Sequence, residues 1–490
     1  MKATVIGSGV AGLAAAIRLQ SMGIAVTVLE TNRFPGGKLT SIVLEGYRFD
    51  AGPSLFTMPE LVLDLFRAAG KDPVGRFAFK RKEIGCHYFY PDGTFLRAYT
   101  DPAQFATEVE RVFAVPAERV RRYLKHSESV YNLVGRTFLE KPLNHWGTWI
   151  SWSVAQAMLH LGHFNLGSTL HETNLRRLGE PRLVQYFDRM ATYNGSSPYR
   201  APGILAIIPH LEHNVGTFIP EGGMISITRS LYALAQEMGV QFEFEAPVTR
   251  IVVEQSRASG VIRHGEKVVS DVVVCNMDIV PAYRKLMPDE VAPEKTLAQE
   301  RSSSGIIFYW GMRKRFAKVE LHNIFFTKDY PAEFQAIFDD GNVANDPTIY
   351  VNATVKDIPS DAPEGCENWF VMVNAPSNSG QDWDAVIARV RRDVLEKLER
   401  HLGESVEAHI EVEQILDPRG IEQRTSSYRG ALYGSSSNSK WSAFLRHPNK
   451  AHRIRNLYFC GGSVHPGGGI PLCLNSAKIA VDCIRADFGL

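Results

Sequence analysis

The alternation of hydrophobic runs and glycine breaks in the first thirty residues predicts two buried strands joined by a helix. KATVI is a short apolar run that ends in glycines, an alanine-rich stretch follows, and a second apolar run, AVTVL, ends at Glu30. Short apolar runs bounded by turn signals are typical of buried parallel strands, and the stretch between them is long enough for a helix. The segment is therefore predicted to form one βαβ unit.

Similar patterns return in the middle and at the end of the chain. Between the glycine pair at 222–223 and Gly239, apolar residues recur at three- and four-residue spacings, which predicts a helix. SDVVVCNMD, which follows, is predicted to be a buried strand. Near the end, NLYFC is predicted to be a strand that leads through a glycine-rich loop into a helix from about Leu472 to Asp487. Because this repeats the geometry of the first unit, we expect all three regions to build one nucleotide-binding lobe.

Length, charge and cysteine content limit what the protein can be. The 490 residues, of which 44% are hydrophobic and 22% charged, exceed the roughly 250–300 that one core usually serves, so two lobes are expected. The 54 Lys and Arg balance 53 Asp and Glu, which predicts no nucleic-acid partner. Six scattered cysteines without a CxxC pair predict no metal site and a reduced, cytoplasmic setting. No secretion signal or membrane-spanning run is visible, so the protein is expected to be soluble or to lie on a membrane surface.

The first glycine cluster has the spacing of a dinucleotide-binding turn. In VIGSGVAGL, one glycine permits a tight turn, the next lets a pyrophosphate approach the backbone, and the third lets the helix pack closely on the strand. The start of the helix offers N–H groups and a partial positive charge to phosphate, and Glu30 can accept hydrogen bonds from ribose hydroxyls. The residues expected to bind the nucleotide are Gly7, Gly9, Val10, Ala11, Gly12 and Glu30.

This motif alone does not separate NAD from FAD, but the next segments favour FAD. TNRFPGGKLTS adds a second glycine pair, Gly36 and Gly37, followed by Lys38, and YRFDAGPSL comes shortly afterwards. Two successive loops that can approach phosphate and ring indicate an extended cofactor, so FAD is the predicted cofactor. Gly52, Pro53 and Ser54 belong to the second of these loops.

The glycine-rich loop GGSVHPGGGIP is predicted to lie against the flavin ring. Its glycines allow close approach to the backbone, and the helix that follows offers donors and a positive dipole end to charge that builds on the ring. His465 within this loop is either a catalytic base or a hydrogen-bonded loop anchor.

Taken in order, many segments resemble the bacterial-type phytoene desaturases and related carotenoid desaturases, FAD-dependent enzymes among the amine-oxidase-like flavoproteins. The segments include VIGSGVAGLAAAIRL, FPGGKLTS, FDAGPSLFTMP, ATYNGSSPYRAPG, IPHLEH, FIPEGGM, VVVCNMD, HNIFF and the run from NLYF to GGGIP. The resemblance covers most of the chain and implies an α/β fold, a Rossmann-like FAD-binding lobe with an inserted α+β substrate lobe. It implies an FAD-binding lobe made of residues 1–80, 220–285 and 415–490, and a substrate-binding, membrane-associating lobe made of 81–219 and 286–414.

The same resemblance assigns further residues. It implies that the backbone at Val248 meets the adenine and that the flavin end contacts Gly462, Ser463, Gly469, Ile470 and Pro471. In GEPRLVQYFDR it makes Glu180 and Arg182 candidate catalytic residues, with surface ion-pair partners as the alternative.

The implied reaction removes two hydrogens from adjacent carbons of a long polyene, one as hydride to flavin N5 and one as a proton. Conjugation stabilises the developing charge, so the protein mainly has to align a C–H bond with the flavin and exclude water. The substrate is expected to be phytoene, diapophytoene or a hydroxycarotenoid desaturated at the 3,4 position, with the loop slightly favouring the last. The alternatives are a carotenoid cis-trans isomerase that uses reduced flavin and, outside catalysis, an isoprenoid-lipid escort protein.

A carotenoid must be drawn from a bilayer, and one segment suggests how. LNHWGTWISWSVAQAMLHLGHF places Trp146, Trp149 and Trp152 at three-residue steps within an amphipathic run, and tryptophans prefer the lipid headgroup boundary. A peripheral membrane helix is therefore expected here, with ordinary packing in the lobe as the alternative. The protein is accordingly expected in the cytoplasm, associated peripherally with the inner face of the cell membrane.

Overall fold

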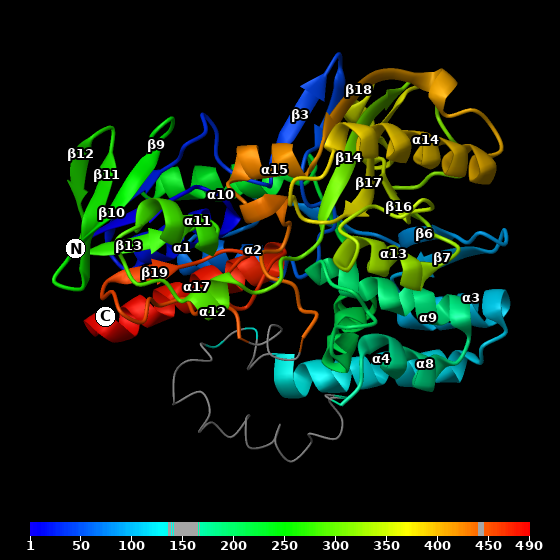
Figure 1. Ribbon diagram of the computed structural model, residues 1–490, viewed down its shortest axis with the longest axis horizontal. Helices are drawn as coiled ribbons and strands as arrows, with labels where there is room; N and C mark the ends of the chain where they lie inside the picture. The colour runs from blue at the N-terminus through cyan, green and yellow to red at the C-terminus, as the bar shows by residue number, and fades with distance from the viewer. Residues whose placement is uncertain (136–138, 140, 142–164, 166, 440–444) are drawn as a thin grey trace.

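The computed structural model describes residues 1–135, 139, 141, 165, 167–439 and 445–490. The helix predicted at 143–164, which carries Trp146, Trp149 and Trp152, lies outside these residues. The described chain forms two lobes side by side, with both termini in the same lobe (Figure 1).

The first lobe is built on a five-stranded sheet in which every neighbouring pair is parallel. Its strand order is β19 (Leu457–Phe459), β13 (Val272–Cys275), β1 (Lys2–Ile6), β2 (Ala25–Leu29) and β9 (Gln241–Glu243). All five strands come from the segments predicted for the FAD-binding lobe. The sheet therefore gathers both ends and the middle of the chain into one unit.

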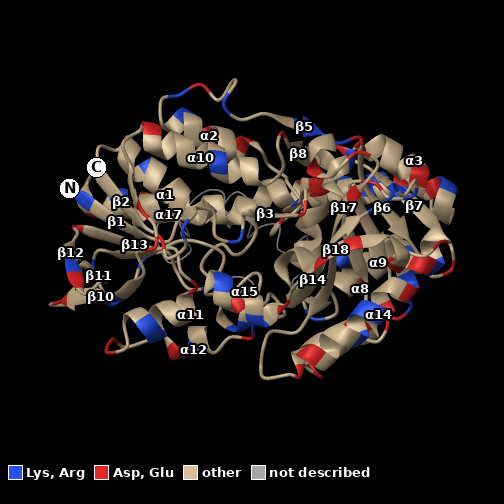
Figure 2. Cartoon of the chain, turned by 90° about the horizontal axis from the view of Figure 1, so that it is seen from above, with Lys and Arg blue, Asp and Glu red and all other residues tan. Residues whose placement is uncertain are grey.

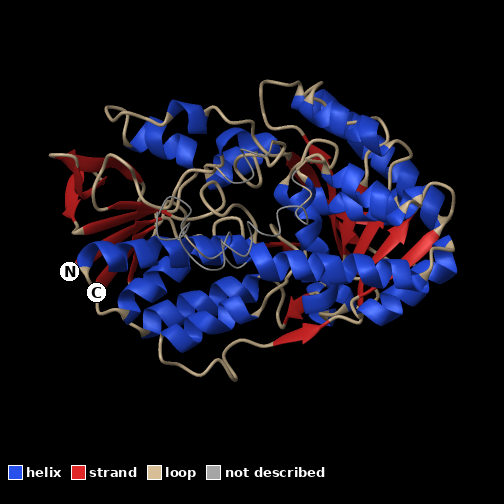
Figure 3. Ribbon diagram, turned by 90° about the horizontal axis from the view of Figure 1, so that it is seen from below, coloured by secondary structure: helices blue, strands red, loops and turns tan. Residues whose placement is uncertain are grey.

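The strands of this sheet other than the edge strand β9 are buried on both faces. Val5 and Val274 pack with the helices α1 (Val10–Ser21), α2 (Glu60–Ala68), α10 (Ile225–Glu237) and α17 (Ile470–Phe488). Their strand neighbours Ile6 and Val273 pack in a second core with the antiparallel strands β10 (Val248–Glu254), β11 (Arg257–Arg263) and β12 (Glu266–Val269). The layer of helices beside the parallel strands is visible in Figure 3. Burial on both faces explains why these strands read as continuous apolar runs.

The second lobe is built on a seven-stranded sheet with one parallel pair, β15 with β6. The order is β18 (Ile410–Leu416), β14 (Ser304–Met312), β17 (Glu367–Ala375), β16 (Ile349–Asn352), β15 (His322–Phe325), β6 (Ile84–Phe89) and β7 (Phe95–Tyr99). The long helix α14 (Trp383–Leu402) packs on one face against Trp310 and Trp369. The helices α3 (Pro102–Phe113), α4 (Ala117–Val130), α8 (Leu170–Leu178), α9 (Pro181–Asp188) and α13 (Tyr330–Phe338) complete the lobe.

The remaining elements connect and cover the two sheets. The hairpin β3 (Ser41–Leu44) with β4 (Tyr47–Asp50) and the pair β5 (Phe79–Arg81) with β8 (Phe218–Pro220) are antiparallel. The other helices are α11 (Ile279–Pro281), α12 (Glu294–Leu297) and α15 (Pro418–Thr425). Short 3-10 or π turns are η1 (Tyr131–Gly135), η3 (Arg189–Asn194), η4 (Gly203–Ile207), η5 (His210–Val215), η6 (Ala282–Leu286), η7 (Thr354–Lys356), η8 (Pro359–Asp361), η9 (Glu407–His409) and η10 (Tyr428–Gly430).

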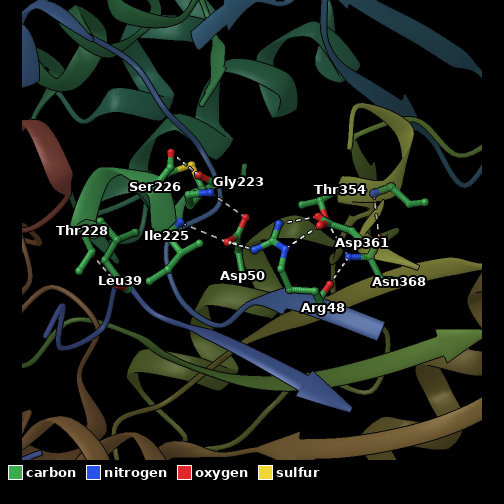
Figure 4. A network of polar contacts seen from close by, with 12 residues as sticks. Leu39, Arg48, Asp50, Gly223, Ile225, Ser226, Thr228, Thr354, Asp361 and Asn368 are labelled. Atoms are coloured by element: carbon green, nitrogen blue, oxygen red, sulfur yellow. Dashed lines mark hydrogen bonds and ion pairs between the residues drawn. The ribbon is translucent and has the colours of Figure 1, made fainter. Parts of the chain in front are cut away.

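An arginine on β4 joins the two lobes (Figure 4). Arg48 donates two hydrogen bonds to Asp361 of the second lobe, at 2.6 and 2.5 Å, and one to Asp50 at 2.8 Å. Asp50 in turn accepts from the backbone N–H groups of Met224 and Ile225, at 2.9 and 3.3 Å, where α10 begins. Both carboxylates are 2% exposed. One buried cation therefore fixes the start of α10 relative to the substrate lobe.

Charged side chains of both signs are interspersed over both lobes, as the near-zero net charge suggests (Figure 2). Among the described helices, none is both long enough and apolar enough to cross a membrane.

Candidate functional site

A single large cavity of about 1350 Å³ lies between the two sheets. It is lined by the glycine loops of the first lobe, by one face of the seven-stranded sheet and by the turns η3 to η5. Every residue predicted to contact the cofactor lines this cavity except Gly12. Protein cavities that hold drug-sized ligands typically measure about 300–1,000 Å³, so this one has room for more than one such ligand.

The first glycine turn forms the entry to α1. Gly7 has a φ of +90°, a backbone conformation that favours glycine. Gly9 is the N-cap residue of α1, so no N-cap side chain accepts from the N–H groups at the start of this helix. A Cβ atom on Gly12 would lie 2.1 Å from the Gly7 carbonyl oxygen. Gly12 therefore lets the helix pack on the strand, as predicted, and contributes to the site only through that packing.

Glu30 directly follows the last residue of β2 and is nearly fully buried. Its carboxylate accepts hydrogen bonds from the Ser8 N–H and Oγ–H, both at 2.7 Å, and from the Asn32 N–H and Nδ2–H, both at 2.9 Å. These contacts fix the carboxylate at the cavity wall beside the turn that precedes α1. Its predicted role toward ribose hydroxyls stays a prediction.

The second loop packs directly on the first. Gly36 pairs with Gly9 in an isolated parallel bridge, and a Cβ on Gly37 would lie 3.4 Å from the Gly9 Cα. Lys38 donates to the Leu432 carbonyl oxygen at 2.9 Å, and burial lowers the pKa of its ammonium group. A Cβ on Gly52 would lie 1.8 Å from the Lys38 carbonyl oxygen. The loops at 36–38 and 52–54 thus stack beside the start of α1, and a side chain on Gly36 or Gly52 would disturb the stack.

The C-terminal glycine loop leads into the second long helix that begins at the cavity. The N-cap of α17 is Gly469, with φ of +104° and no side-chain cap, and a Cβ there would meet none of the described residues within 4 Å. Ser463 accepts a hydrogen bond through its Oγ from the Ile279 N–H at 2.9 Å. Two helices of 12 and 19 residues therefore start at one cavity, and neither start is capped by an N-cap side chain.

Asn276, which the sequence analysis did not single out, connects these two regions. In the amide orientation that satisfies both ends, its Oδ1 accepts from the N–H groups of Gly9 and Gly12, at 3.3 and 3.2 Å, and its Nδ2 donates to the Cys460 carbonyl oxygen at 3.2 Å. Asn276 directly follows β13, at the carboxyl edge of the parallel sheet where ligands bind in such folds. That position was the available signal for finding it.

His465 lines the cavity and has the contacts of a loop anchor. Its Nε2 lies 3.0 Å from the Lys141 carbonyl oxygen, and its own carbonyl oxygen accepts from Asn449 Nδ2 and Ser476 Oγ at 2.9 and 2.7 Å. Burial lowers the pKa of its imidazole to about 4, so the ring is neutral near pH 7. A direct catalytic role for His465 stays a prediction.

Glu180 and Arg182 do not line the cavity, and their predicted part in catalysis stays a prediction. Glu180 is the N-cap of α9 and accepts from the Leu183 N–H at 2.6 Å. Arg182 donates to Glu180 and to Asp92, both at 2.9 Å, and neither residue lines the cavity. A capping carboxylate and an ion pair, the alternative reading, account for both residues.

The substrate-lobe wall of the cavity is a sheet face that is largely apolar. Within a strand, side chains two positions apart point to the same face, and such side chains from neighbouring strands reach this wall. They include Ile307, Ile324, Thr348, Phe370, Met372 and Leu416. Sequence alone did not identify them, because β14 and β17 are buried along almost their whole length and show no alternation.

These features fit a flavin dinucleotide. Phosphate oxygens suit the uncapped start of α1, the glycines leave room for close approach to the backbone, and the uncapped start of α17 suits the electron-rich edge of a flavin ring. The residues that would hold the cofactor are those of the three glycine loops with Glu30 and Val248.

Comparison with known proteins gives close relatives over the full chain. The sequence is 48% identical over 483 residues to a 1-hydroxycarotenoid 3,4-desaturase of a Flavobacterium species, covering 99% of both chains. It is 31% identical over 492 residues to a 4,4'-diapolycopene oxygenase of a Methylomonas species, covering 99% of this chain and 98% of the relative.

Solved structures share the fold at low sequence identity. An oxidoreductase from Methanosarcina mazei matches with a TM-score of 0.64 and 16% identity, covering 98% of this chain and all of the other. A cyclohexylamine oxidase from Brevibacterium oxydans matches with a TM-score of 0.62 and 15% identity, covering 100% and 99%. The predicted Rossmann-like lobe with an inserted substrate lobe is therefore confirmed as a fold.

The family model described as flavin containing amine oxidoreductase matches residues 10–485, nearly the whole chain. The predictions of an oxidoreductase and of FAD as its cofactor are confirmed at this level. The chain belongs to the flavin containing amine oxidoreductase family.

Proposed function

We propose that this protein is an FAD-dependent carotenoid desaturase that acts on a hydroxycarotenoid at a carbon–carbon bond near its hydroxylated end. The observation that carries the proposal is the continuity of one cavity from the glycine loops to an apolar sheet face. The 48% identity to a 1-hydroxycarotenoid 3,4-desaturase supports the same substrate class.

The chain's own residues have three tasks in this reaction. A flavin bound at the glycine loops supplies the hydride acceptor for oxidation of the C–C bond. The loops at 36–38, 52–54 and 461–469 would hold the flavin, and the apolar wall with Ile324, Phe370 and Met372 would align the polyene and exclude water. Conjugation along the polyene stabilises the positive charge on the oxidised substrate, so loss of the proton from it needs no strong base.

The test is an anaerobic single turnover with the flavin-loaded protein. We expect an acyclic carotenoid with a hydroxyl at C1 to bleach the flavin absorbance and to yield a product lighter by two hydrogens. Bleaching reports reduction of the cofactor, and the mass reports which reaction occurred. In a parallel reaction with the flavin reduced beforehand, an isomerised product of unchanged mass would identify an isomerase. A purified protein that releases no flavin on denaturation would identify an isoprenoid escort protein. Failure of every acyclic carotenoid to bleach bound flavin would overturn the proposal.

We also propose that the protein works at the cytoplasmic face of the cell membrane, since its substrate is soluble only in lipid. The motivation is the run with Trp146, Trp149 and Trp152, which amphipathic helices at lipid interfaces typically carry. We expect the parent protein to float with liposomes and a variant with all three tryptophans changed to serine to remain at the bottom of the gradient. Equal flotation of both proteins would exclude this segment as the anchor.

A further inference from the structure

One part of the cavity wall is polar, in contrast to the apolar sheet face around it. His322 on β15 and Tyr350 on β16 reach the cavity from the seven-stranded sheet, beside Ile324 and Phe370. Arg189 and Tyr193 on η3 line the cavity as well. A hydrocarbon polyene needs no hydrogen-bond donors, so this polar group requires another explanation.

The hydrogen bonds around His322 determine where its proton lies. Asn352 Nδ2 donates to the Leu321 carbonyl oxygen at 2.9 Å, which fixes its amide orientation, and it lies 3.1 Å from His322 Nδ1. Nδ1 therefore accepts, and its single lone pair takes the nearer donor, the Tyr350 hydroxyl at 2.7 Å, with the Asn352 amide as the longer contact. The proton of the neutral ring then sits on Nε2.

The Nε2 proton has no acceptor in the part of the chain that the structure describes. His322 is 3% exposed, and burial together with the nearby cations Lys82 and Arg189 lowers the pKa of the ring to about 3, which keeps it neutral. A buried donor without an acceptor is costly unless a ligand or water supplies one. The Nε of Arg189 is likewise buried and has no partner among the described residues.

Acceptor groups also reach this part of the cavity. Arg189 donates to the hydroxyl oxygens of Tyr88 and Tyr193, at 2.6 and 3.0 Å, and Tyr193 donates to Glu212 at 2.8 Å. The carboxylate of Glu212 lines the cavity and lies 3.5 Å from the Arg189 guanidinium. Unpartnered donors and a glutamate on the wall of one cavity suit a hydroxyl group, which both accepts and donates a hydrogen bond.

The polar group is also close to the loop predicted to hold the flavin. Ser54 Oγ lies 2.7 Å from the Tyr350 hydroxyl, which contacts His322. In a hydroxycarotenoid with its hydroxyl at C1, a single carbon separates the hydroxylated carbon from the 3,4 bond. A group that binds the hydroxyl must therefore lie beside the flavin rather than at the distant end of the cavity.

We infer that His322 is a specificity-determining residue whose Nε2–H donates a hydrogen bond to the hydroxyl of the substrate, with Arg189 and Glu212 completing the polar pocket. This inference rests on the proposed desaturation of a hydroxycarotenoid. To that proposal it adds the identity of the residues that select the hydroxylated end of the substrate and thereby place the 3,4 bond at the flavin. Tyr350 is a positioning residue, since it fixes the orientation and tautomer of His322.

The test compares two carotenoids that differ only in the C1 hydroxyl. Their binding is titrated to the holoenzyme with its flavin already reduced, so that no desaturation takes place, and their single-turnover rates are measured with oxidised flavin. A site built to bind a hydroxyl rejects the analogue that lacks it. We expect the parent to prefer the hydroxylated carotenoid by about tenfold to a hundredfold in both measurements.

Four variants make the assignment specific. His322→Leu should lose the preference by weakening only the hydroxylated carotenoid, and His322→Gln, which retains a donor at the same reach, should keep most of it. Tyr350→Phe, which preserves the ring, should reduce the preference about two- to fivefold. His87→Leu, on the neighbouring strand β6 and outside the cavity lining, should change neither carotenoid. Flavin content and Tm establish that each variant is folded.

The outcomes separate this inference from the proposed function. If the parent binds and oxidises both carotenoids equally, or His322→Leu weakens both to the same extent, the hydroxyl site is wrong and the desaturase proposal stands. If neither carotenoid bleaches the flavin, the desaturase proposal fails, and the binding titration still decides whether His322 recognises the hydroxyl.

Discussion

Replacing Gly12 with alanine is expected to give a protein that purifies almost free of flavin. The new Cβ would lie 2.1 Å from the Gly7 carbonyl oxygen and 3.0 Å from the side-chain amide of Asn276, so α1 would have to move away from β1. Overpacking of this kind costs about 1–3 kcal/mol, and here it also displaces the helix start that is expected to meet the phosphates. The ratio of flavin to protein absorbance, with the thermal midpoint, measures both effects.

Gly167 provides the matched control for this substitution. Among the described residues, a Cβ on Gly167 would meet nothing within 4 Å, and the Gly167 backbone is outside the left-handed region. Gly167→Ala should therefore bind flavin as the parent does. A Gly12→Ala protein with full flavin content and an unchanged thermal midpoint would show that α1 can shift without loss, and would contradict the packing role assigned to Gly12.

Replacing Arg48 with methionine is expected to destabilise the protein by about 3–5 kcal/mol, the usual loss when one partner of a buried ion pair is removed. Asp50 and Asp361, each 2% exposed, would keep their buried carboxylates without the cation between them. Asp50 also holds the start of α10 and precedes the loop at 52–54, so flavin should be lost more readily. Thermal unfolding of the flavin-loaded proteins and the rate of flavin release measure these effects.

Arg67 on α2 is the control, because it contacts two carboxylates in the same way but in solvent. It pairs with Glu60 and Asp64 at 3.0 and 2.6 Å, with 53% of its side chain exposed. Exposed ion pairs contribute little, so Arg67→Met should leave the thermal midpoint unchanged. Equal losses of thermal stability from the two substitutions would contradict the claim that burial makes the Arg48 ion pair strongly stabilising.

The sequence was informative where a function needs a particular backbone. Glycine spacing in VIGSGVAGL, PGGK and GGSVHPGGGIP indicated three loops, and the structure brings all three to one cavity. Helices were expected after Gly223 and from about Leu472, and they occur as Ile225–Glu237 and Ile470–Phe488. The start of the second helix was placed two residues late, because Ile470 and Pro471 occupy its first turn.

The candidate site was harder to predict where side chains from distant segments meet. Glu180 and Arg182 were candidate catalytic residues in the sequence. In the structure, Glu180 caps α9, Arg182 donates to Glu180, and neither residue lines the cavity. His322 opens HNIFF, one of the segments that carry the family resemblance, but neither it nor Tyr350 was assigned a role from the sequence. Their importance depends on which face of their strands the other lobe covers, and a run of residues buried on both sides does not reveal that.

By itself, the sequence determined the glycine turns, the parallel strands beside them and the cofactor class, because glycine conformation and apolar runs are local properties of the chain. Only the tertiary structure decided that Ser54, Tyr350 and His322 form one chain of contacts, and that Asn276 ties the first glycine turn to β19. These contacts join residues separated by tens to hundreds of positions. The packing of the two lobes selects them, and local sequence preferences carry no record of it.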